Sequence, residues 1–324
     1  MCPITGPPLR VGGILRTGGR RAMRPACHSE SLPMNQKMRS WLFAPGDSAR
    51  KMEKAIASEA DRVILDLEDA VAESAKDDAR KLIRETLETQ DEAARMRIFV
   101  RINPLDGPHA LTDLAAVMPG RPGGIILPKV YGRQDAETVH LYLEALEAAN
   151  GIEIGTTRML VLITETAESM FHCGDFKGVP RLIGLTWGSE DLADALGASG
   201  NREADGRYTF TYEMARSFCL LGASTAGVAG IETIDAEFRD LDVVRRRAER
   251  VRRDGFRGML AIHPAQVPVI NEAFTPSAED IAEAREIVAL FAANPQAGTI
   301  GHKGKMLDRP HLSRAQYLIG QIDE

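Results

Sequence analysis

Short apolar runs alternate with longer amphipathic stretches from Arg39 onward, and this alternation is the feature that most restricts the fold. The runs that read as strands are Ser40–Ala44, Arg62–Leu67, Arg97–Ile102, Gly124–Leu127, Met159–Thr164, Leu182–Thr186, Val228–Ile231 and Met259–Ile262. Helix-like stretches between them include Ala49–Ala60, Ser74–Thr89, Gln134–Ala149, Tyr212–Ala223 and Asp240–Asp254. Eight strands, each followed by a helix, predict an α/β protein built as a closed (β/α)8 barrel. A doubly wound open sheet is the alternative, but no Gly-x-Gly-x-x-Gly turn follows the first run.

The ends of the chain differ in character from the predicted barrel domain, which covers residues 38–295. Residues 1–37 carry five arginines and one acid among Gly, Pro and Ser, and we expect a flexible N-terminal extension there. A transit-like leader, or a true start at Met34 or Met38, are alternatives for this segment.

A break is predicted at the other end by Asn294-Pro295-Gln296-Ala297-Gly298, after a helix that begins near Ser277. Residues 296–324 are therefore expected to form a separate C-terminal lid segment. A mobile flap that closes the mouth of the barrel is one interpretation, and a plain helix docked on the barrel is the other.

Composition excludes several classes of protein. The net charge of −6 argues against general nucleic-acid binding, and no stretch of the sequence reaches the apolar length of a membrane span. The four cysteines are scattered, without metal-ligand spacing or a disulfide framework, which fits a reducing compartment. We expect a cytoplasmic protein, or a mitochondrial one if residues 1–37 are a transit peptide.

Two carboxylates follow neighbouring predicted strands and indicate a metal site. Glu165 closes the apolar run that begins at Leu160, and Asp191 follows the run Leu182–Thr186. The C-terminal ends of parallel barrel strands meet at the active-site face, and two such acids can hold one hard divalent cation, which would be Mg²⁺. Either acid could instead cap the N-terminus of the next helix.

Further polar residues stand at other predicted strand ends. Arg101 has the planar fork that grips a carboxylate or ketone oxygen, although an ion pair with Glu68 or Asp69 is an alternative. Two more residues have open interpretations: His263 as a general base or a structural residue, and Lys129 as a Schiff-base lysine or the partner of an acid at the mouth.

Seven motifs occur in order along the chain: Ser40-Trp41-Leu42-Phe43-Ala44-Pro45-Gly46, Asp66-Leu67-Glu68-Asp69-Ala70-Val71, Val100-Arg101-Ile102-Asn103-Pro104, Leu127-Pro128-Lys129-Val130, Thr164-Glu165-Thr166-Ala167, Gly188-Ser189-Glu190-Asp191-Leu192 and Ile262-His263-Pro264-Ala265-Gln266. This series resembles the citrate lyase beta subunit-like branch of the HpcH/HpaI aldolase family, which includes malyl-CoA and citramalyl-CoA lyases. The resemblance covers about residues 38–324. It implies a TIM barrel, Mg²⁺ as cofactor, and an oxo-acid-lyase that makes or breaks a carbon–carbon bond beside a CoA thioester.

The resemblance also assigns roles to residues. Glu165 and Asp191 would be the metal ligands, and Arg101 would bind the substrate oxygen as a catalytic residue. Around them, Glu68 and Asp69 would order the waters of the metal. The residues that correspond to CoA contacts in relatives are Phe43 and Lys54, whereas Ser48 replaces an arginine that some relatives carry.

The tail discriminates within the family. Gly304-Lys305-Met306-Leu307-Asp308-Arg309-Pro310 is similar to the flap whose aspartate enters the active site of an adjacent subunit, which makes Asp308 the expected acid/base residue. The expected substrates are acyl-CoA and 2-oxo acids, and the expected assembly is a homotrimer or homohexamer. Two alternatives stay open: a citrate lyase beta subunit that uses a carrier-protein thioester, and a non-catalytic acyl-CoA-binding paralogue.

Overall fold

Eight parallel strands form a closed barrel, as predicted. The computed structural model describes residues 37–320. Each strand pairs with the next in sequence, and β1 pairs with β8 to close the barrel. The strands are β1 (Ser40–Pro45), β2 (Arg62–Asp66), β3 (Ile98–Arg101), β4 (Gly124–Leu127), β5 (Arg158–Leu162), β6 (Leu182–Thr186), β7 (Ala229–Glu232) and β8 (Gly258–Ala261).

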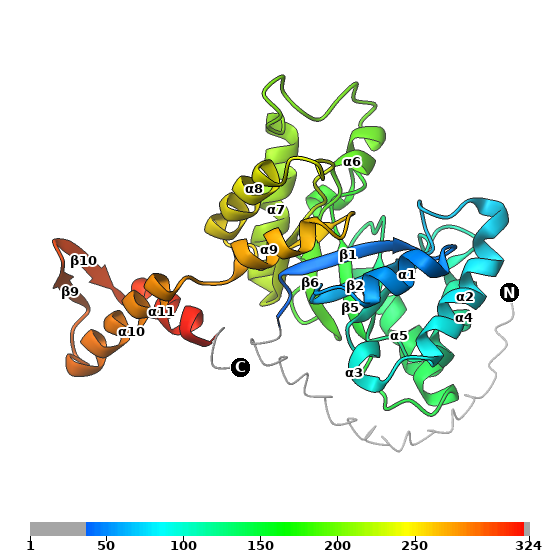
Figure 1. Cartoon of the computed structure of the whole chain (residues 1–324), viewed down its shortest axis with the longest axis horizontal. Helices are drawn as coiled ribbons and strands as arrows, with labels where there is room; N and C mark the ends of the chain where they lie inside the picture. The colour runs from blue at the N-terminus through cyan, green and yellow to red at the C-terminus, as the bar shows by residue number, and fades with distance from the viewer. Residues whose placement is uncertain (1–36, 321–324) are drawn as a thin grey trace, which may run out of the picture.

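Helices surround this barrel (Figure 1). They are α1 (Ala49–Ile56), α2 (Lys76–Glu88), α3 (Glu92–Arg95), α4 (Ala110–Val117), α5 (Arg133–Ala149), α6 (Ser189–Ala195), α7 (Phe210–Ala226), α8 (Leu241–Asp254) and α9 (Gln266–Phe274). The expectation of a helix after every strand is wrong at β5. In residues 163–181 the structure has the single 3₁₀ turn η3 (Ser169–Phe171), because glycines and Pro180 interrupt this segment.

Apolar side chains alternate between the two faces of the barrel wall, as the pleat of a strand requires. One cluster fills the interior of the barrel, and a larger one lies between the strands and the helices. In the interior, Trp41 and Phe99 meet edge to face with ring centroids 4.9 Å apart. A Cβ atom at Gly124 would lie 2.1 Å from the ring of Phe99, so this position on β4 requires glycine.

The chain continues after α9 as a separate unit, which we call the C-terminal arm (residues 278–320). It consists of α10 (Ala278–Ala293), β9 (Thr299–His302), β10 (Lys305–Asp308) and α11 (Arg309–Gly320), and α10 packs against α11. Ser277 caps α10 in a capping box with Asp280. The antiparallel hairpin β9–β10 was not predicted. Its sequence signal is Lys303-Gly304, both at positive φ (48° and 76°), as a two-residue hairpin turn demands.

The C-terminal arm leaves the barrel at the end opposite to the mouth. The side chain of Arg39, just before β1, donates a hydrogen bond to Thr275 after α9 at 2.9 Å, so α9 ends where β1 begins. Figure 1 shows the arm projecting away from the barrel on that side, while the arrow of β1 points the other way. Within one chain the arm therefore does not cover the mouth, and its function as a lid stays a prediction that involves a second copy.

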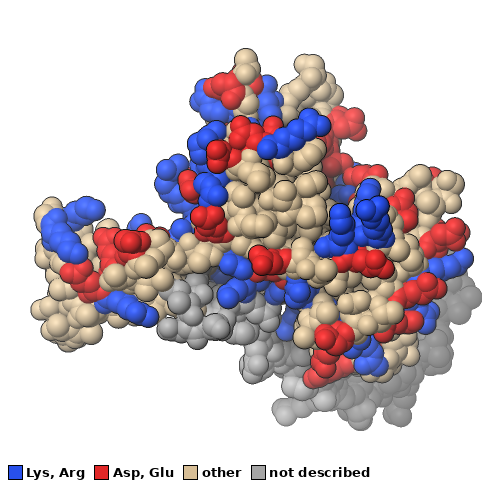
Figure 2. Space-filling model, in the orientation of Figure 1, with Lys and Arg blue, Asp and Glu red and all other residues tan. Residues whose placement is uncertain are grey.

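The surface carries charges of both signs. Figure 2 shows lysines and arginines interspersed with acids over one face of the molecule. Within residues 37–320, each helix is too short or too polar to cross a membrane. The expectations for the N-terminal extension, including a transit peptide and a start at Met34, fall on residues 1–36, which lie outside the described part of the chain.

Candidate active site

Charged side chains from five successive strand ends gather at the mouth of the barrel. We call this group the mouth cluster, and its members are Asp66, Glu68, Asp69, Arg101, Lys129, Glu165 and Asp191. The sequence predicted that these strand ends would meet, and the structure brings all seven residues together. Five carboxyl groups face two cationic groups, so the cluster is a natural site for a further cation.

Arg101 lies at the centre of the cluster and is almost fully buried. Its Nε and Nη2 atoms each donate to a carboxylate oxygen of Asp66 at 2.7 Å, and its Nη1 atom lies 2.7 Å from Glu68 and 3.5 Å from Asp69. The alternative of an ion pair with Glu68 and Asp69 is thus confirmed. The anchor at Asp66 was not predicted, although Asp66 and Arg101 are direct cross-strand neighbours in the β2–β3 pairing.

Glu165 is buried behind the end of β5. Its Oε2 atom accepts a hydrogen bond from the backbone N–H of Lys129 at 2.6 Å. A Cβ atom at Gly188 would lie 2.8 Å from the Cγ and Oε1 atoms of Glu165, so the absence of a side chain at Gly188 lets the carboxyl group lie there. Burial raises the pKa of Glu165 well above its ordinary value, and the nearby carboxylates of Asp191 and Glu68 raise it further.

Lys129 connects several of the acids. Its Nζ atom donates to Glu68 at 2.5 Å and lies 2.9 Å from Oδ1 of Asp191. Burial alone would lower the pKa of Lys129, but its bonds to Glu68 and Asp191 outweigh burial and raise it. The interpretation of Lys129 as the partner of an acid at the mouth is confirmed, and a charged lysine of this kind is unsuited to Schiff-base formation.

Glu165 and Asp191 are not helix N-caps. Asp191 is the third residue of α6, whose N-cap is Gly188, and the N-cap of η3 is Glu168. In residues 37–320 no three His, Cys, Asp or Glu side chains are arranged as a complete metal cage. Mg²⁺ commonly uses one or two protein carboxylates and fills its remaining positions with water and substrate, so the pair Glu165 and Asp191 fits this ion.

The remaining predicted residues lie in different surroundings. Phe43 is a half-buried residue of β1, and the guanidinium group of Arg101 lies 4.9 Å from its ring centroid. Lys54 is exposed in the last turn of α1, and its contact with CoA stays a prediction. The Nδ1 atom of His263 accepts the N–H of Ala265, and its ring stacks on Phe238, which supports the structural interpretation of this histidine.

Asp308 lies on β10 in the C-terminal arm, away from the mouth cluster of its own chain (Figure 1). Its carboxylate is paired with His311, one turn further along the chain. The hydrogen bond from His311 holds the pKa of Asp308 below its ordinary value. To act as the expected acid/base residue, Asp308 would therefore have to enter the barrel mouth of another copy of the chain.

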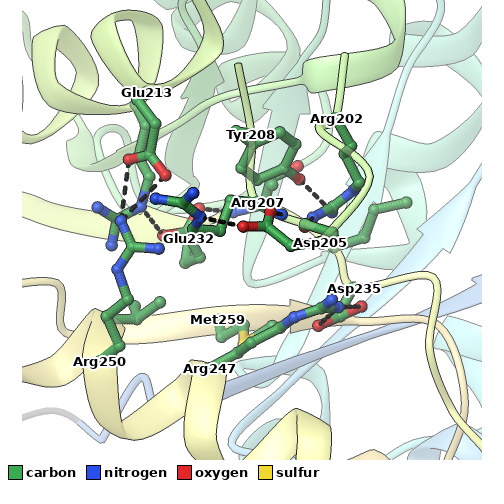
Figure 3. A pocket seen from close by; sticks show the side chains of 15 residues that line it. Arg202, Asp205, Arg207, Tyr208, Glu213, Glu232, Asp235, Arg247, Arg250 and Met259 are labelled. Carbon is green, nitrogen blue, oxygen red and sulfur yellow. Dashed lines mark hydrogen bonds and ion pairs between the residues drawn. The ribbon is translucent and has the colours of Figure 1, made fainter. Parts of the chain in front are cut away.

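A polar cavity of about 170 Å³ lies beside the end of β7. Glu232 of β7 accepts hydrogen bonds from Trp187 and, at 2.5 Å, from Arg216 of α7. Figure 3 shows that other charged groups around it are also mutually paired: Arg250 with Glu213, Arg247 with Asp235, and Arg207 with Asp205. Within each pair the opposite charges compensate each other, and we interpret the network as structural support for the α7–α8 side of the barrel.

The family is decided by comparison with known proteins. The sequence model of the HpcH/HpaI aldolase/citrate lyase family matches residues 39–264, which include all eight strands and every member of the mouth cluster. The chain belongs to this family. The resemblance seen in the seven motifs is thereby confirmed.

Relatives of this family member include enzymes that act on CoA esters. The (3S)-malyl-CoA thioesterase of Cereibacter sphaeroides is 33% identical over 287 residues, which cover 88% of this chain and 94% of the relative. The mitochondrial citramalyl-CoA lyase of Rattus norvegicus is 32% identical over 308 residues, with 91% and 89% covered. The lyase class predicted from the sequence is thus represented among the relatives.

A solved structure extends the likeness to three dimensions. Protein CitE from Mycobacterium tuberculosis, in complex with magnesium, acetoacetate and coenzyme A, superposes with a TM-score of 0.73 at 32% identity. The match covers 88% of this chain and 98% of that protein. The predicted cofactor, Mg²⁺, is therefore the metal that accompanies this fold in a relative.

Proposed function

We propose that this protein is a Mg²⁺-dependent carbon–carbon lyase that cleaves, or forms, a 3-hydroxy-dicarboxylyl-CoA thioester such as malyl-CoA or citramalyl-CoA. The products of cleavage would be a 2-oxo acid and an acyl-CoA. The observation that carries this proposal is the convergence of Glu165, Asp191 and Arg101 at the mouth. Two acids suited to a hard cation lie beside a guanidinium group that is itself held in place by Asp66.

The substrate would bind through its carboxylate and its hydroxyl oxygen. Mg²⁺ held by Glu165 and Asp191 would supply a Lewis acid next to that oxygen. Arg101 uses Nε and one N–H of Nη2 on Asp66 and directs Nη1 at Glu68 and Asp69, which leaves the second N–H of Nη2 as the donor for the substrate oxygen. Because this donor is fixed before the reaction, it stabilises charge that develops on oxygen without a cost of reorganisation.

Cleavage converts the hydroxyl carbon into a carbonyl. The hydroxyl group gives its proton to solvent water, the carbon–carbon bond breaks, and its electron pair stays with the other fragment as a thioester enolate. Protonation of the enolate carbon then yields the acyl-CoA. We assign this proton transfer to Asp308, which would donate in cleavage after taking up a proton from solvent, and whose ionised form beside His311 would remove the same proton in the direction of synthesis.

Asp308 would act in the mouth of a second copy, since the C-terminal arm leaves its own barrel at the opposite end. A homotrimer or homohexamer would provide such an arrangement. A complementation experiment tests it: Asp308→Asn and Glu165→Gln proteins, each inactive alone, are mixed after partial dissociation. If each site combines residues from two copies, hybrid oligomers regain part of the activity. If mixing restores nothing although hybrids form, the shared site is excluded.

The reaction itself is tested with purified protein and a panel of malyl-CoA, citramalyl-CoA and citryl-CoA. Release of glyoxylate, pyruvate or oxaloacetate in a coupled assay, abolished by a chelator and restored by Mg²⁺, is the expected result. Release of free CoA with an intact hydroxy acid would instead identify a thioesterase, the activity named for the relative from Cereibacter sphaeroides.

Two other candidates give different results in the same assay. A citrate lyase beta subunit would be inactive on free CoA esters and active once a carrier-protein thioester is added. A non-catalytic paralogue would show CoA-ester binding with no turnover on any substrate.

A further inference from the structure

Lys129 contacts both proposed metal ligands. Its backbone N–H donates to Glu165 at 2.6 Å, and its side-chain Nζ lies 2.9 Å from Asp191. A left-handed backbone, with φ of 49°, allows these two contacts to be made from one residue. A lysine seldom adopts this conformation, and such strain persists where the surrounding contacts impose it.

The ammonium group of Lys129 also lies among further acids. Besides Asp191, its Nζ atom is 2.5 Å from Glu68 and 3.5 Å from Asp69. Arg101, the other cation of the mouth cluster, is directed at Asp66 and Glu68. The ion-pair partner of Asp191 in the cluster is therefore Lys129.

A metal ion at Glu165 and Asp191 would need the carboxylate that Lys129 now holds. Two cations that share one carboxylate repel each other, and the repulsion is considerable at contact distance because the Lys129 and Asp191 side chains are both partly buried. The Lys129 side chain is 30% exposed and has Glu68 and Asp69 as alternative partners. It can move away from Asp191 without losing its charge compensation.

We propose that Lys129 is an internal counter-cation that keeps Glu165 and Asp191 assembled in the metal-free protein, so that Mg²⁺ binding is an exchange of cations. The ammonium group holds Asp191 until the metal arrives and then stays with Glu68. Lys129 is in this sense a positioning residue that sets the affinity for the metal. The inference rests on the proposed function, since it assumes that Glu165 and Asp191 bind the ion.

Titration calorimetry with MgCl₂ on the full-length protein tests the exchange without any turnover. Lys129→Met should bind Mg²⁺ at least tenfold more tightly than the wild type, because the competing charge is gone. Tenfold corresponds to about 1.4 kcal/mol. The metal-free variant should also melt at a lower temperature than the wild type, since its carboxylates have lost their internal partner. Added Mg²⁺ should raise the melting temperature of the variant more than that of the wild type.

Matched variants separate competition from loss of structure. Lys129→Arg keeps the charge and should bind Mg²⁺ within about threefold of the wild type, and Lys177→Met, at an exposed lysine on the loop that leads into β6, should be unchanged. If Lys129→Met does not fold, Lys129→Gln is measured in the same way. Equal or weaker Mg²⁺ binding by the neutral variant would overturn the exchange and leave the proposed function intact. An absence of Mg²⁺ binding by the wild type would overturn both.

Discussion

Asp66→Asn is the substitution that most clearly separates the positioning of Arg101 from general packing. Asp66 is 1% exposed and accepts four hydrogen bonds, two from Arg101 at 2.7 Å and two from the backbone N–H groups of Glu68 and Ala70 at 3.0 and 3.1 Å. Removing one partner of a buried ion pair costs about 3–5 kcal/mol. Asparagine keeps one acceptor oxygen, so we expect about 3 kcal/mol, which lowers Tm by roughly 4–5 °C in a chain of this size.

Activity should fall by more than stability explains. Without its two hydrogen bonds to Asp66, the guanidinium group of Arg101 can rotate further toward Glu68 and Asp69. A misplacement of about 1 Å costs roughly 10²-fold in kcat/KM. Steady-state kinetics with the best thioester, at a temperature where the variant is fully folded, measure this loss. Magnesium affinity should change little, since Asp66 contacts neither proposed ligand in the structure.

The control is a similar pair at the opposite end of the barrel, between the residues that precede β1 and β2. Asp61, just before β2, accepts bonds from Nε and Nη2 of Arg39 at 2.9 and 2.8 Å. Asp61→Asn should destabilise the protein by a similar or smaller amount and leave kcat/KM unchanged. If Asp66→Asn melts earlier but keeps kcat/KM within threefold of the wild type, the positioning role of Asp66 is wrong.

Three further predictions concern single contacts. Gly188→Ala places a methyl group against Glu165 and should weaken Mg²⁺ binding about tenfold by calorimetry; unchanged affinity would show that the close approach is not needed. Asp308→Asn should lower kcat by roughly 10²–10⁴-fold with Mg²⁺ affinity unchanged, and full turnover would exclude its acid/base role. Burial opposes ionisation of Glu147, but bonds from Arg181 and from the N–H groups of Gly155 and Thr157 outweigh it and hold its pKa below 4.5. Its contribution to stability is thus complete above about pH 4.5 and lost as the pH falls through the folded-state pKa. In denaturant unfolding, the advantage of wild type over Glu147→Gln should shrink over that acidic range, and a pH-independent difference would contradict this assignment.

The barrel could be predicted from the sequence because each strand carries its own signal. Gly124–Leu127 and Leu182–Thr186 were predicted to the residue, since both are continuous apolar runs that end at turn or polar residues. Their order fixes the topology, because parallel strands with intervening helices close in sequence order. The acids and the arginine at the mouth followed from the same reasoning.

Features that depend on the register between strands, or on packing far from the local sequence, could not be predicted. Asp66 looked like one acid among several, and its bond to Arg101 depends on the cross-strand alignment of β2 and β3. The left-handed backbone of Lys129 has no signal in Leu-Pro-Lys-Val. The hairpin around Lys303-Gly304 has four-residue strands, too short for the alternation of apolar residues to be read.

The central claim is that one divalent ion is held by Glu165 and Asp191, and crystals soaked in MnCl₂ test it most directly. Mn²⁺ substitutes for Mg²⁺ at oxygen sites and gives an anomalous signal that locates it independently of the refined atoms. We expect one strong peak at roughly 2.0–2.3 Å from a carboxylate oxygen of each residue. A peak elsewhere in the barrel, or an unoccupied mouth in crystals whose soaked protein remains active, would contradict the account.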